Sequence, residues 1–198
     1  MDDKPDISQD LIDQFVGAAH GDFDAVVRLL DEHPNLIEAQ SSWQETAIEA
    51  AAQTGNVQIT EYLLERGAKL DICTAAMLGK SDMVKALLDR DPELVEAVGA
   101  HGIPVLYFPV ITGQEQTAEV LFDAGADLNA GDGSLTPLHG AVVFDNPAMV
   151  EWLLEKGARV DVVDHEGHTP LQIAVANDRT TLVEMLRQKE EEQDSEDF

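Results

Sequence analysis

The sequence predicts an all-α array of about six helix-turn-helix units, stacked along one axis. Three regularities in the 198 residues lead to this prediction. Amphipathic segments close with a pair of large apolar residues at recurring intervals. A glycine or aspartate stands eight residues before each pair, and the word Thr-Pro-Leu occurs at Thr136 and again, 33 residues later, at Thr169. A period of this length is typical of supersecondary units that bury their apolar faces against their neighbours.

The apolar pairs and the turn residues place the units along the chain. The first leucines are Leu29, Leu63, Leu87, Leu121, Leu153 and Leu186, the last followed by Arg187 rather than a second apolar residue, and the turn residues are Gly21, Gly55, Gly79, Gly113, Asp145 and Asp178. Glycine and aspartate suit a tight break between two short helices. We expect units at about 11–40, 41–69, 70–98, 99–130, 131–162 and 163–189. An acidic N-terminal segment, 1–10, precedes them, and an acidic tail, 190–198, follows and is expected to be solvated and frayed.

The third unit interrupts the period. Successive apolar pairs are 34, 24, 34, 32 and 33 residues apart. The short interval leaves too little chain for a loop before the third unit, so Asp71 is expected to cap the next helix directly. Gly21 and Gly79 are 58 residues apart, as are Leu29 and Leu87. The first four units therefore resemble a duplicated pair.

The Thr-Pro-Leu motif at residues 136–138 has a direct physical interpretation. The Thr136 hydroxyl can accept a hydrogen bond from a free N–H at a helix start. Pro137 suits the first helical position, where its missing N–H costs nothing. Leu138 begins a narrow apolar face. The same roles are expected for Thr169, Pro170 and Leu171.

Two segments carry a resemblance to a known family. "TPLHGAVVFDNPAMVEWLLEKGARVD" and "GHTPLQIAVANDRTTLVEMLRQ" resemble the ankyrin repeat, and weaker copies extend the similarity over about residues 11–189. The resemblance implies a solenoid with short β-hairpin fingers, here with the finger missing at the third unit. It also implies that His139 ties its helix to the adjacent loop.

Composition excludes several classes of function. The formal net charge is −27, and such a surface repels nucleic acid and anionic membranes. The single cysteine, Cys73, suits a reducing compartment, and the acidic start of the chain is unlike a signal peptide. We therefore expect a cytoplasmic monomer without cofactor. The acidity fits either adaptation to a salt-rich cytoplasm or a partner with a basic rim.

Few residues could act in catalysis or bind a metal ion. Cys73 is expected to be a small buried residue, and the loop histidines His165 and His168 have no third metal ligand at a convincing spacing. We predict no catalytic residue and no metal site. The alternative, a small metal-dependent or enzymatic role, depends on His165, His168 or Cys73.

The resemblance implies a protein-protein interaction module, an adaptor, scaffold or inhibitor. The family's binding positions, on finger tips and on the ends of the first helices, correspond here to partner-binding candidates that include a run of apolar residues. They are Trp43, Met77, Leu78, His101, Ile103, Ile111, Leu135, Phe144, His165 and His168, with Val143 beside them. An exposed apolar stripe on an acidic chain indicates an interface. Packing is the alternative, with Trp43 and Ile103 folded inward and Ile111 and Val143 in the core.

The fourth unit departs from the pattern. Pro104 stands where threonine is expected, Tyr107 replaces the histidine, and Pro109 falls where a small residue belongs. A proline inside a helix removes a hydrogen bond and bends the backbone, so we expect a kink here.

Overall fold

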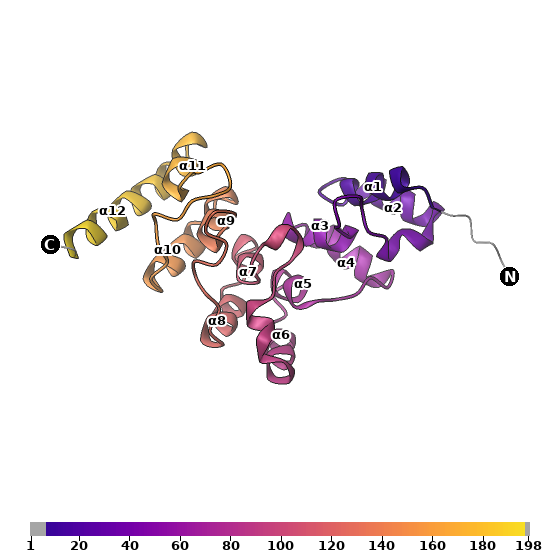
Figure 1. The fold of residues 1–198 in the computed structure, drawn as a ribbon, viewed down its shortest axis with the longest axis horizontal. Helices are drawn as coiled ribbons and strands as arrows, with labels where there is room; N and C mark the ends of the chain where they lie inside the picture. Colours follow the sequence, from indigo (N-terminus) through magenta and orange to yellow (C-terminus); the bar gives the residue numbers. More distant parts are fainter. Residues whose placement is uncertain (1–6, 197–198) are drawn as a thin grey trace.

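The computed structural model describes residues 7–196 and shows a row of helix pairs (Figure 1). The described residues contain twelve α-helices: α1 Gln9–Ala18, α2 Phe23–Glu32, α3 Ala47–Gln53, α4 Val57–Glu65, α5 Ile72–Met77, α6 Ser81–Arg90, α7 Tyr107–Ile111, α8 Glu115–Asp123, α9 Pro137–Val143, α10 Pro147–Glu155, α11 Pro170–Ala176 and α12 Thr180–Glu196. Three short 3₁₀ segments are η1 Pro34–Glu38, η2 Pro92–Glu96 and η3 Ala100–Gly102. The prediction of an all-α array is confirmed.

The first helices begin where side chains can cap them. Thr136 and Thr169 each accept a hydrogen bond from the third helical N–H, and Pro137 and Pro170 occupy the first helical position. The Asp71 carboxylate accepts the N–H of Thr74, as expected from the sequence. These caps satisfy N–H groups that have no partner inside the helix, and so fix each helix start.

The connections between pairs are loops with little β-structure. Within the described residues, only isolated bridges occur, Gln40 with Thr46, Val98 with Pro104, and Ser134 with Asp164. The loops at 124–136 and 156–169 are long, whereas residues 66–71 alone join α4 to α5. We call residues 40–46 the first finger and residues 98–104 the second finger.

The duplication seen in the sequence recurs in the structure. Adding 58 to the bounds of α2, η1 and α4 gives those of α6, η2 and α8. The same shift converts the bridge of the first finger into that of the second finger. Equivalent residues therefore support the same local structure in both halves, although the two fingers precede helices of different length.

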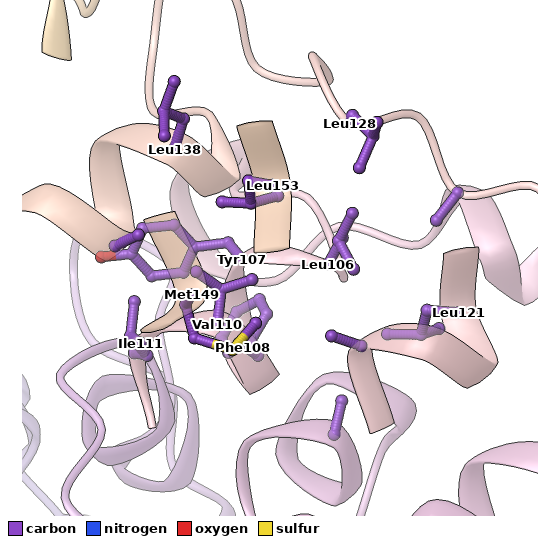
Figure 2. Packing of buried hydrophobic residues seen from close by; sticks show 14 of the residues in the cluster. Leu106, Tyr107, Phe108, Val110, Ile111, Leu121, Leu128, Leu138, Met149 and Leu153 are labelled. Atoms are coloured by element: carbon purple, nitrogen blue, oxygen red, sulfur yellow. The ribbon is translucent and has the colours of Figure 1, made fainter. Parts of the chain in front are cut away.

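Buried apolar residues form two clusters. The first contains Phe15 to Ala68 from α1–α4 and their loops, and the second contains Ala52 together with residues from α5 to α12. Figure 2 shows the centre of the second cluster, where Tyr107, Phe108, Met149 and Leu153 meet. Gly140 permits this packing, because a Cβ there would stand 2.6 Å from the Tyr107 ring.

Two local expectations were wrong. Pro109 lies in the first turn of α7, where its missing N–H removes no intrahelical bond, so it does not interrupt a helix. Residues 190–196 of the expected tail are not frayed but continue α12, and residues 197–198 lie outside the described residues. At the other end, α1 begins at Gln9, inside the expected acidic segment, whose residues 1–6 lie outside the described residues. Among the described helices, none combines the length and apolarity needed to cross a membrane.

Candidate functional site

The ends of the first helices expose only part of the expected apolar stripe. Trp43 is 41% exposed, Phe144 is 37% exposed and Val143 is 47% exposed. Exposure was wrongly expected for Met77, Ile103 and Ile111, which are buried. The remaining apolar candidates, Leu78 and Leu135, are half-buried, and the three histidines His101, His165 and His168 are exposed.

The turn between α3 and α4 lies against Ile111 and contributes to its burial. A Cβ on Gly55 would lie 3.3 Å from Thr112, 3.5 Å from Ile111 and 3.7 Å from the Phe144 ring. The second helix pair therefore covers the ends of α7 and α9. The Thr112 hydroxyl also donates to the Met77 carbonyl at 2.7 Å. The array curves closely enough to bring the Gly55 turn against these residues, and the centre of the stripe becomes core.

The side chain of Glu45, in the first finger, has no exposure, which is unusual for a glutamate. Its carboxylate accepts hydrogen bonds from Trp43 Nε1 at 2.8 Å and from Gln53 Nε2 at 2.6 Å. Burying a carboxylate is costly unless donors surround it. The shift of 58 residues pairs Glu45 with Ile103, which is also buried. Because the sequence left the burial of Ile103 itself open, this equivalence could not have revealed the burial of Glu45.

Two histidines approach the same carboxylate from different helix pairs. His20 Nε2 lies 3.5 Å from Glu45 Oε2, and His101 Nε2 lies 3.8 Å from it. His101 comes from the second finger. Because no finger separates α4 from α5, the second finger reaches the first finger, and its histidine completes the surroundings of Glu45.

His139 has the structural role that the resemblance implied. It is buried, its Nδ1 lies 2.8 Å from the Thr136 hydroxyl, and its Nε2 lies 3.1 Å from the His168 carbonyl. Burial lowers the pKa of His139, although the bond to the His168 carbonyl and the nearby carboxylates act in the opposite direction. The imidazole therefore links α9 to the loop before α11.

The loop before α11 brings His168 together with two carboxylates rather than with His165. Oxygens of Asp164 and Glu166 lie 3.6 Å and 3.4 Å from His168 Nδ1. Asp164 Oδ1 also accepts hydrogen bonds from the backbone N–H groups of Glu166 and His168. These two bonds give the Asp164 carboxylate a structural role in the turn. Asp164 is buried and Glu166 and His168 are exposed, and their ligand atoms lie within 4.8 Å of one another. These three residues could hold a metal ion, a grouping that the spacing of the histidines did not indicate, although such acidic groups are common without an ion.

Cys73 lies in α5 with 3% exposure. Burial, with the carboxylates of Asp71 and Glu49 nearby, raises the pKa of its thiol far above the ordinary value. The thiolate is the reactive form of cysteine, so this environment suits an inert packing residue.

The arrangement agrees with comparisons to known proteins. Models of ankyrin repeats match residues 14–64 and 130–197. The chain is 33% identical over 138 residues to an ankyrin repeat protein of fowlpox virus, covering 64% of this chain and 72% of the relative. It is 29% identical over 157 residues to rat ankyrin repeat and SAM domain-containing protein 6, covering 72% of this chain.

A third relative is a Caenorhabditis elegans homologue of transient receptor potential cation channel subfamily A member 1, 28% identical over 163 residues and 77% of this chain. The chain spans only 13% of that relative and 18% of the rat protein. The helix pairs, their caps and these matches agree, and the chain belongs to the ankyrin repeat family.

Proposed function

We propose that this protein is a non-enzymatic binding module, an adaptor, scaffold or inhibitor, that holds a partner protein on the face formed by its fingers and first helices. The observation that carries the proposal is the exposure of Val143 and Phe144, side by side at the end of α9. Exposed apolar neighbours on a chain of net charge −27 favour a protein contact over solvation.

The proposed contact surface consists of Trp43, Val143 and Phe144, with His101, His165 and His168 at its polar positions. Leu78 and Leu135 contribute their half-exposed atoms, whereas Met77, Ile103 and Ile111 support it from beneath. Aromatic anchors commonly dominate interface energies, so Trp43 and Phe144 are its strongest candidates. The surrounding acidity favours a partner with a basic rim.

Other parts of the proposal rest on composition and on the family. We infer that each helix pair is one repeat unit, that the protein is a monomer, and that it resides in the cytoplasm, where the free thiol of Cys73 stays reduced. We infer no metal or cofactor requirement. The enzymatic alternative has no support from Cys73, because its thiol is buried.

Comparative capture tests the proposal. Immobilised wild type is compared with Val143→Ser for the proteins that each retains from a lysate, and the identified partner is then titrated against both. We expect Val143→Ser to weaken binding about ten-fold while the melting temperature stays within about two degrees.

Met83→Ser is the matched control, because Met83 is 42% exposed on α6, outside the proposed surface. It should bind as wild type does. Equal retention of the partner by wild type and both variants would place the contact elsewhere.

A further inference from the structure

The interface between the second helix pair, α3–α4, and the third, α5–α6, lacks the polar connections found at every other interface. Among the described residues, no hydrogen bond joins the part up to Leu70 to the part from Asp71 onward. The ion pair between them is His101 with Glu45, at 3.8 Å. Residues 66–71 are the covalent connection.

Each of the other interfaces is bridged by side chains or by loop backbone. Ser42–Asp13 and Lys69–Glu38 bridge the first and second helix pairs, and Ser81–Thr117 and Thr112–Met77 bridge the third and fourth. Trp152 and Lys156 both donate to Glu119 between the fourth and fifth pairs, and Gly133–Val163 and Arg179–Asp145 bridge the fifth and sixth. In an array that is stable through nearest-neighbour contacts, the interface without bridges is the first to separate.

A buried polar group at the same interface also lacks a partner. A narrow crevice, too small to hold a water molecule, lies between α3 and α5, with Ala52, Cys73 and Phe108 among its lining residues. The buried hydroxyl of Thr74, which lines the crevice, has no hydrogen-bond partner. An unsatisfied buried polar atom weakens an interface. The division of the core into two clusters falls at this place.

We propose that the array opens as a hinge between α3–α4 and α5–α6, ahead of global unfolding. In the closed state the Gly55 turn contacts Phe144, and the second finger contacts the first finger. Opening separates Trp43 from Phe144 and so changes the shape of the face that they share. The missing loop between α4 and α5 is its physical cause, since a finger there would have supplied hydrogen bonds to its neighbours. This inference goes beyond partner binding, and its test requires no partner.

Cys73 provides a native reporter, because it is the single cysteine of the chain and is buried at this interface. The rate at which a thiol reagent such as DTNB modifies the full-length protein is measured at increasing urea concentrations. We expect modification at least ~10-fold faster than global unfolding allows, with a weaker dependence on urea. Modification that requires global unfolding, with the same urea dependence, would overturn the hinge.

Hydrogen exchange separates hinge opening from local unfolding of α5. A hinge leaves intact the bonds from Ala75 N–H to the Asp71 carbonyl and from Leu78 N–H to the Thr74 carbonyl. These amides should therefore remain protected on the time scale of thiol modification. If they exchange as fast as the thiol reacts, α5 unfolds by itself and the hinge is wrong.

A pair of neighbouring variants tests whether opening occurs at this interface. Phe144→Ala removes a ring that would lie 3.7 Å from a Cβ on Gly55, whereas Val143→Ala shortens the neighbouring exposed side chain, none of whose atoms is among the three nearest to that position. We expect modification of Cys73 to accelerate about three- to ten-fold in Phe144→Ala and to be unchanged in Val143→Ala. Equal rates in wild type and both variants would contradict opening between these two helix pairs.

Discussion

The indole N–H of Trp43 donates to the carboxylate of Glu45 at 2.8 Å, and the carboxylate has no exposed surface. An exposed aromatic residue thus depends for its orientation on a buried charge. The first finger, α3 and the second finger meet at this charge, through Trp43, Gln53 and His101.

Glu45→Gln should destabilise the fold and release Trp43. The amide has one acceptor oxygen in place of two, so either Trp43 or Gln53 loses its partner. We expect a loss of about 1–2 kcal/mol in the free energy of unfolding, measured by urea denaturation, and a red shift of tryptophan emission. Glu61→Gln, at an exposed position on α4, should stay within about 0.5 kcal/mol of wild type. Equal stability of the two variants would show that the buried network contributes little.

Gln44→Gly should stabilise the protein. Gln44 is exposed and has φ of 66°, a left-handed conformation that Gly102 and Gly167 adopt at the equivalent points of their loops. Glycine adopts this conformation without steric cost, so we expect a gain of about 0.5–1 kcal/mol by thermal or urea unfolding.

The reverse change provides the control. Gly102→Ala introduces a Cβ with no atom within 4 Å, so its loss of about 1 kcal/mol would come from backbone strain alone. A destabilised Gln44→Gly variant would mean that the Gln44 side chain stabilises the finger more than its conformation costs.

His139→Gln should reduce the sensitivity of the fold to mild acid. Burial lowers the pKa of His139, so the folded protein holds this imidazole neutral when a free histidine, with a pKa of ~6.5, takes up a proton. The unfolded state then binds more protons, and the free energy of unfolding decreases as pH falls below ~6.5. Gln172 forms the same capping box in α11 without titrating.

The measurement is the free energy of unfolding at two values, about pH 7.5 and 5.5, bracketing the titration. The loss on acidification should be smaller in His139→Gln than in wild type, although the variant is less stable at both values because it lacks the bond to the His168 carbonyl. An identical loss in both proteins would assign the acid sensitivity to other groups.

Salt should stabilise the protein. With 39 acidic and 12 basic residues, the folded chain repels itself, and added ions screen that repulsion. We expect the melting temperature to rise by several degrees between dilute buffer and about 1 M potassium chloride. A flat or falling melting temperature would argue against adaptation to a salt-rich cytoplasm and favour a basic partner as the reason for the acidity.

The sequence by itself determined the helix pairs, their caps and the duplication. Thr136 and Asp71 accept hydrogen bonds from N–H groups three residues ahead, and Pro137 occupies the first helical position. These roles involve only neighbouring residues, so local spacing is enough to predict them. The alternation of apolar and turn residues likewise sets each helix pair. The role of His139 followed from the family, because its partner lies in the next loop.

Only the tertiary structure decided which residues of the apolar stripe face solvent. The curvature of the array brings the Gly55 turn against Ile111 and the second finger against Glu45. These contacts join residues 56 positions apart, and they depend on how six rigid pairs add their small rotations. No local pattern in the sequence encodes that sum, so the burial of Ile111 and of the Glu45 carboxylate emerged only in the folded array.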